Sequence, residues 1–156
     1  MLVPSTAPEA APTRILIGVA VGEPGKEDVA FAGRLARHFR AEVTILTVLP
    51  ETDRGSRDNL GEGSPSPAES MAERFLLGNS RTLWRLGVPV STVIRYGNAR
   101  EQILAQLTEG QHDLLVLGAP LPGRDGVLRL GGLVGRLLPE LKSCPVLIIR
   151  SPEAAS

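Results

Sequence analysis

Apolar residues along the chain alternate between short continuous runs and longer segments with helical spacing. The continuous runs cover residues 14–21, 42–49, 88–95, 113–118 and 145–150. Near-continuous apolar character is typical of parallel strands that are covered on both faces. The pattern therefore predicts five strands.

Helical spacing occurs between these strands. We expect helices at residues 26–40, 69–86, 99–110 and 131–141, the third of them capped by Asn98. The apolar helix positions expected to pack are Val29, Ala30, Phe31, Leu35, Ala36, Phe39, Met71, Phe75, Leu76, Leu83, Trp84, Leu86, Ile103, Leu104 and Leu107.

Strands that alternate with helices favour right-handed βαβ crossovers. We therefore predict an α/β fold: a single-domain open parallel sheet of five strands, Rossmann-like, with helices on both faces. Ligands of such sheets bind beyond the carboxyl ends of the strands. Gly22, Pro50 and Gly118 each follow a predicted strand, so we expect them at that edge.

The expected domain covers residues 14–150 of the 156-residue chain. Residues 1–13 are rich in Pro, Ala, Ser and Thr and are expected to form a disordered tail, and residues 151–156 form a second tail. Residues 50–68 are dense in Gly, Ser, Pro and charge, which predicts a flexible surface loop.

Composition excludes several classes of partner. Seventeen basic and seventeen acidic residues cancel, and aromatic residues are only 3%, so we expect no nucleic-acid partner. No apolar run approaches the roughly 20 residues that span a bilayer, so no membrane partner is expected. One cysteine, Cys144, and a first segment without signal-peptide character predict a cytoplasmic protein.

The two histidines and the one cysteine are not expected to bind a metal or to take part in catalysis. His38 lies near the end of a predicted helix, where a cation is favourable, and His112 is expected in a surface loop. Cys144 is expected to pack as a small apolar residue before Pro145. These residues form no metal-binding set, and we expect neither a metal site nor catalytic residues.

A glycine-rich stretch, VLGAPLPGRDGVLRLGGLVGRLL, spans residues 116–138 and leads from a predicted strand into a helix. Glycines in that position often let the backbone approach a phosphate. The stretch has no Gly-Lys-Ser/Thr, so it is not a Walker loop. Its glycines could also simply shape a turn and a close contact between helix and sheet.

Five segments together resemble the universal stress protein (UspA-like) family, over about residues 14–150. The segments are RILIGVAVGEP, RLARHFRAEVTILTVLP, YGNAREQIL, DLLVLGAP and LGGLVGRLLPELKSCPVLIIR. The resemblance implies the adenine nucleotide alpha-hydrolase-like version of the predicted fold. It also implies a stress-response or regulatory protein that acts through partners.

ATP-binding members of that family carry Gly, two residues, Gly, nine residues, then Gly-Ser or Gly-Thr, and an Asp where the first strand ends. Gly118 and Gly131 match the first and third glycines. Leu121 stands in place of the second glycine, Gly132 in place of the hydroxyl residue and Ala20 in place of the Asp. The resemblance therefore implies a degraded nucleotide-binding loop.

Two functional interpretations remain open. In the first, the chain is a homodimeric interaction module with weak or absent ATP binding, paired through residues 145–150 and serving a regulatory protein partner. In the second, it is a sensor for ATP, AMP or a related adenine nucleotide. Slow ATP hydrolysis is a third and weaker alternative, because no general base or metal-binding carboxylate is evident in the loops. The candidate ligand-binding residues are Val19, Ala20, Val21, Gly22, Val48, Gly118, Leu121, Gly123, Arg124, Arg129, Gly131, Gly132 and Leu133.

Overall fold

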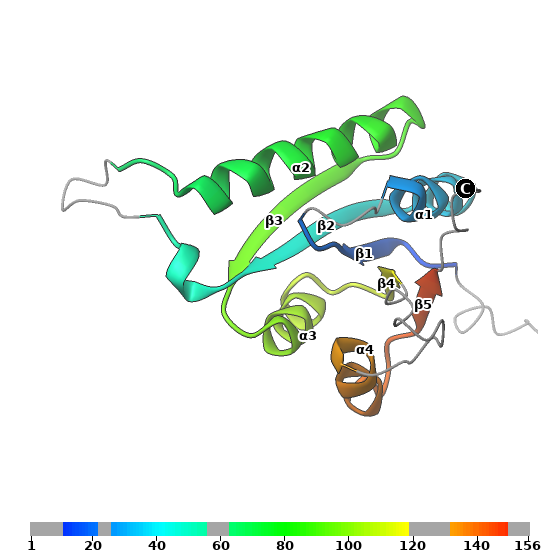
Figure 1. Ribbon diagram of the computed structural model, residues 1–156. Coiled ribbons are helices and arrows are strands. Elements are labelled where there is room, and N and C mark those ends of the chain that lie inside the picture. The colour runs from blue at the N-terminus through cyan, green and yellow to red at the C-terminus, as the bar shows by residue number, and fades with distance from the viewer. Residues whose placement is uncertain (1–10, 22–25, 56–62, 119–131, 150–156) are drawn as a thin grey trace, which may run out of the picture.

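Five parallel strands form one sheet in the computed structural model, which describes residues 11–21, 26–55, 63–118 and 132–149 (Figure 1). The sheet order is β3-β2-β1-β4-β5, and every neighbouring pair is parallel. This arrangement confirms the predicted fold class. The strands are β1 (Arg14–Gly18), β2 (Glu42–Leu49), β3 (Val90–Tyr96), β4 (Leu114–Gly118) and β5 (Val146–Ile149).

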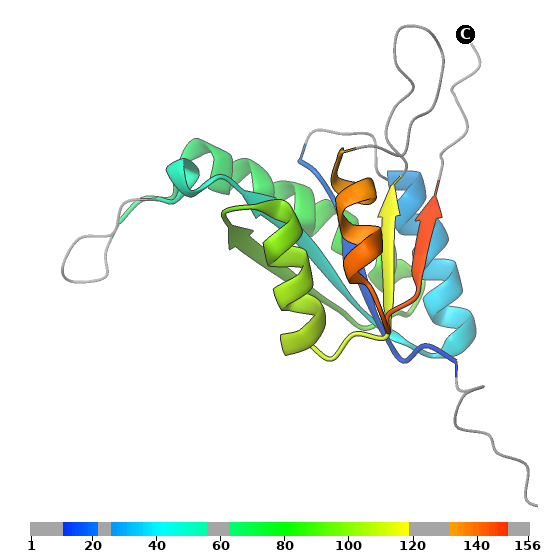
Figure 2. The same cartoon turned by 90° about the horizontal axis from the view of Figure 1, so that it is seen from below.

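Helices cover both faces of the sheet (Figures 1 and 2). The first face carries α1 (Lys26–Phe39) and α2 (Pro67–Arg85), and the second carries α3 (Ala99–Glu109) and α4 (Gly132–Leu137). The last helix is shorter than predicted, because the chain passes into the 3₁₀ helix η3 (Leu138–Glu140). Pro139 has no N–H to donate, which interrupts the α-helical bonding at that point.

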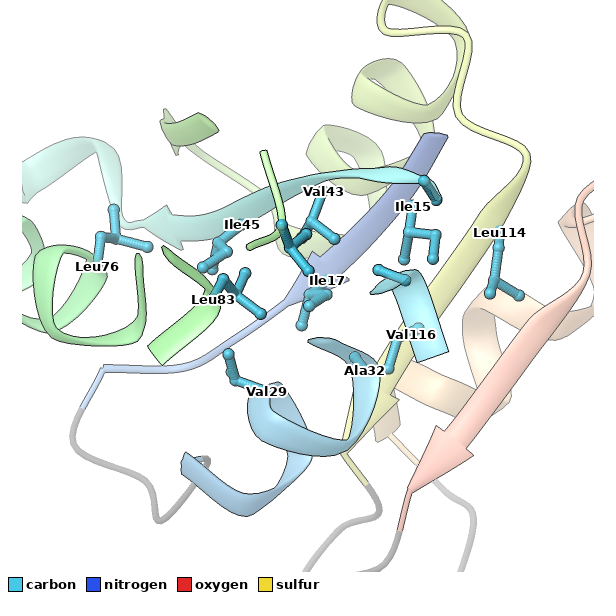
Figure 3. Close-up of a cluster of buried hydrophobic side chains, with 13 residues drawn as sticks. Ile15, Ile17, Val29, Ala32, Val43, Ile45, Leu76, Leu83, Leu114 and Val116 are labelled. Atoms are coloured by element: carbon cyan, nitrogen blue, oxygen red, sulfur yellow. The ribbon is translucent and has the colours of Figure 1, made fainter. Parts of the chain in front are cut away.

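Successive residues of a strand pack into two separate hydrophobic cores, one on each face of the sheet. Ile15 and Ile17 point to the α1 and α2 side, where they meet Val29 and Leu83 (Figure 3). Leu16, between them, packs on the other side with residues of α3 and α4. Both faces of β1 are therefore buried, as its continuous apolar run indicated.

The connection from β2 to α2 has defined structure at both of its described ends. It includes the 3₁₀ helix η2 (Glu51–Asp53). Ser66 caps α2: its hydroxyl accepts from the Glu69 N–H at 3.1 Å and donates to the Asp53 carbonyl at 2.5 Å. The Glu69 carboxylate bonds back to the Ser66 N–H at 2.9 Å and also accepts from the Tyr96 hydroxyl. The prediction of a flexible loop is wrong for these ends, and residues 56–62 lie outside the described residues.

Some apolar helix residues that we expected to pack are exposed. Phe31 is 44% exposed, Met71 60% and Trp84 53%. The apolar stripes of α1 and α2 are wider than the surface that the sheet and the neighbouring helix cover. Within α2, Leu76 and Leu83 are buried, as predicted.

Candidate functional site

The carboxyl ends of β1, β2 and β4 meet at one edge of the sheet. Gly18, the last residue of β1, is paired with Leu46 of β2 and Leu117 of β4. The Val19 N–H still donates to the Leu46 carbonyl at 2.9 Å, and the chain then leaves the sheet. The prediction that this strand runs to Val21 was therefore too long. The shorter strand leaves Val19, Ala20 and Val21 beside the ends of its neighbours, as a ligand site of this fold requires.

A buried hydroxyl holds the backbone at this edge. Thr47 of β2 is 2% exposed, and its hydroxyl donates to the Val19 carbonyl at 2.9 Å. A buried hydroxyl without a partner would cost stability, so this bond links the end of β1 to β2. Val48, the next residue, is half-buried on the opposite face with the α3 and α4 core. Ala20 is exposed, which leaves its position open to a ligand.

Gly118 ends β4 in close contact with a carboxylate that the sequence did not bring to attention. A Cβ atom on Gly118 would lie 2.7 Å from Oδ2 of Asp28, so a side chain at position 118 would require the Asp28 carboxylate to shift. Asp28 lies in the first turn of α1, the helix that follows β1. Its location could have been inferred, because a helix that follows a parallel strand begins at the carboxyl edge. Acidic residues are also favoured in a first turn.

The described part of this edge includes one carboxylate, that of Asp28, which lies against the residue where the glycine-rich stretch begins. Gly132 and Leu133 begin α4, and that six-residue helix is anchored by Val134 and Leu137 in the second core. The remaining candidates, Gly22, Leu121, Gly123, Arg124, Arg129 and Gly131, lie outside the described residues.

His112 differs from our expectation of a surface loop residue. It is only 9% exposed, because the chain turns back beneath the end of α3 after Gly110. Its Nε2 lies 3.3 Å from Nε2 of Gln106, and its Nδ1 is buried without a partner among the described residues. Burial lowers the pKa of this imidazole, which favours the neutral form.

The other chemical candidates remain unremarkable. Cys144 is half-buried against the second core, which confirms the packing interpretation, and burial raises the pKa of its thiol. His38 lies in the last turn of α1. Among the described residues, no group of three or more His, Cys, Asp or Glu is placed to hold a metal ion. No described helix is both long enough and apolar enough to cross a membrane.

Comparison with known proteins identifies a family. The sequence model of the universal stress protein family matches residues 12–150. No curated protein matches the sequence.

Solved structures of that family have the same fold. A universal stress protein from Archaeoglobus fulgidus is 15% identical with a TM-score of 0.69, covering 87% of this chain and 97% of its own. A universal stress protein in complex with cAMP is 18% identical with a TM-score of 0.64, covering 90% and 98%. A family member from Arabidopsis thaliana with AMP bound is 17% identical with a TM-score of 0.55, covering 90% and 93%.

Proposed function

The chain belongs to the universal stress protein family, and from this premise we propose that it is a regulatory interaction module in which nucleotide binding has weakened. It would act in the cytoplasm through a protein partner and would carry no catalytic activity of its own. The observation that carries the proposal is Ala20, exposed just beyond the end of β1, at the position where the resemblance implies an Asp in ATP-binding members.

Ala20 weakens one part of an adenine nucleotide site. It has no carboxylate to accept hydrogen bonds from a nucleoside. A charge-assisted hydrogen bond is worth about 1.5–3 kcal/mol, so a single missing contact weakens affinity more than about ten-fold.

The alternative function is a sensor of adenine nucleotides at the Gly118/Gly131 loop. Its support comes from two family members, the one in complex with cAMP and the one from Arabidopsis thaliana with AMP bound. The open position of Ala20 beside Gly118 leaves space for such a ligand at the same edge. Arg124 and Arg129 would then supply the phosphate contacts.

Calorimetry with ATP and magnesium separates the two functions. We expect weak or absent binding of ATP to the wild-type protein, because Ala20 supplies no carboxylate to the nucleoside. A submicromolar ATP dissociation constant for the wild-type protein would establish the sensor instead. Mass spectrometry of small molecules released from denatured protein would detect any ligand that co-purifies.

We also propose a homodimer paired through β5, an edge of the described sheet. Its four residues, Val-Leu-Ile-Ile, are all half-buried, and they alternate between the two cores. An apolar edge strand favours pairing with another strand, and antiparallel pairing of identical edges is self-complementary.

The substitution Leu147→Lys should prevent this pairing, because a charged side chain on an edge strand blocks strand addition. At low micromolar concentration, light scattering should report the mass of one chain for Leu147→Lys and of two chains for the wild-type protein. Met71→Lys adds the same charge at an exposed apolar position of α2 and should remain dimeric. A wild-type protein that is monomeric at high micromolar concentration would exclude the dimer.

A further inference from the structure

A groove of about 620 Å³ is lined by residues of α2 and β3. These two elements lie side by side (Figure 1). One wall is a stripe of α2 formed by Glu73, Leu77, Ser80 and Trp84, whose spacing of three or four places them on one side of the helix. The other wall is formed by Val90, Ser91, Thr92 and Ile94 of β3.

The outer edge of β3 has free hydrogen-bonding capacity. Val43 of β2 donates to the Pro89 carbonyl, and Gly97 donates to the Leu49 carbonyl, both at 2.9 Å. In parallel pairing the backbone groups of alternate residues face the same neighbour, so the odd-numbered residues of β3 face β2. The even-numbered residues, 90, 92 and 94, point their N–H and C=O groups away from the described sheet.

This edge lacks the protection that exposed edges usually have. Its one charged side chain, Arg95, is held on the opposite face by Gln106, at 2.9 Å, and by Glu109 of α3. The residues that line the groove from β3 are uncharged. Natural edge strands that remain single usually carry charged residues or bulges, so a seven-residue edge whose one charged side chain is held on the opposite face favours pairing.

The exposed side chains of α2 match a second copy of the same helix. Leu77 is 44% exposed and Trp84 is 53% exposed, so the stripe presents apolar surface beside the open strand. Exposed Glu73, which lines the groove, and exposed Arg74 lie in the first half of α2, whereas exposed Arg81 and Arg85 lie towards its end. Two antiparallel copies of α2 would bring each Glu73 towards the end of the other copy that carries Arg81 and Arg85.

We propose that the β3–α2 face binds a second copy of this chain. The two β3 strands pair antiparallel about a two-fold axis, which continues the sheet from one chain into the other. Because α2 runs beside β3 on one face of the sheet (Figure 1), the same axis brings the two α2 stripes together. One symmetry operation therefore covers the open edge, the apolar stripe and the opposite charges at once.

Amide hydrogen exchange on the wild-type protein tests this face without any substitution. Raising the protein concentration from low to high micromolar should slow exchange at Thr92 and Ile94 at least about ten-fold, because these amides become paired only when the β3 strands of two chains associate. The amides of Ser91 and Val93, which face β2, provide the internal reference and should not change. Equal exchange of Thr92 and Ile94 at both concentrations would overturn the proposal. So would protection that appears only when cell extract is added, which would assign the groove to another protein.

Variants separate this face from the β5 edge. In the Leu147→Lys background at high micromolar concentration, we expect association that Leu77→Glu weakens at least about ten-fold in light scattering. Met71→Glu, on another side of α2, is the matched control and should associate as before. A Leu147→Lys protein that stays monomeric at that concentration would overturn the proposal, as would association that is insensitive to Leu77→Glu.

Discussion

The triple variant Ala20→Asp, Leu121→Gly, Gly132→Ser should bind ATP about a hundredfold more tightly than the wild-type protein. The three substitutions restore the carboxylate, the glycine and the hydroxyl that the resemblance assigns to ATP-binding members of the family. Two of them add polar contacts, each worth about 1.5–3 kcal/mol when one partner is charged, and every 1.4 kcal/mol is a factor of about ten. Calorimetry with ATP and magnesium measures the gain directly.

Two of the substituted residues, Ala20 and Gly132, lie where the new side chains can be accommodated. Ala20 is exposed immediately after β1, so an aspartate at that position need not displace core residues. Gly132 is the first residue of α4, where a hydroxyl can cap or contact an anion. None of the three substitutions alters Thr47, whose hydroxyl donates to the Val19 carbonyl at 2.9 Å in the wild-type protein.

Ala20→Asn in the same triple background is the matched control, since it has nearly the same shape without the charge. It should recover less affinity than the aspartate. If the triple variant binds no better than the wild-type protein, the three departures do not explain weak binding.

The sequence predicted the bounds of a strand or the cap of a helix correctly where one local pattern, such as an apolar run or a capping residue, determined it. β2 begins at Glu42 and ends at Leu49, as its β-branched apolar run indicated. The Asn98 side chain accepts from the Glu101 N–H at 3.1 Å and caps α3, as expected. β1 was predicted too long, because the apolar run continues to Val21, whereas Gly18 is the last residue that pairs with both β2 and β4. Val19 is still packed against the first core, so hydrophobicity alone does not reveal where the strand ends.

Contacts between distant segments were not predictable in the same way. Asp28 and Gly118 are 90 positions apart, and nothing in either local sequence indicates that a carboxylate closes on that glycine. His112 looked like a loop residue, yet it is buried because the Gly110 turn folds it against Gln106. Trp84 was expected to pack in its helix, but it is 53% exposed, and β3 has no further described strand beside it to cover that side of α2. Which side chains share a site is a property of the topology.

The substitution Gly33→Ala should destabilise the protein, and removal of one leucine should largely abolish that effect. A Cβ on Gly33 of α1 would lie 2.4 Å from Cδ2 of Leu83 and 2.9 Å from Cδ1 of Leu86. Such overpacking costs about 1–3 kcal/mol, more than the helix propensity of alanine returns. Leu83 is fully buried in the first core (Figure 3), so Leu83→Ala alone should cost about 2–5 kcal/mol.

The double variant should be no less stable than Leu83→Ala alone, because the new methyl group then occupies space that the leucine has left. Urea unfolding of the four proteins gives a double-mutant cycle, and we expect a coupling energy of at least about 1 kcal/mol. Gly78→Ala is the control: a Cβ there meets nothing within 4 Å, so it should stabilise α2 by about 0.5–1 kcal/mol. Strict additivity would show that α1 can shift away from α2 at little cost. Because α1 also carries Asp28, such a shift would mean that the contact between Asp28 and Gly118 is adjustable.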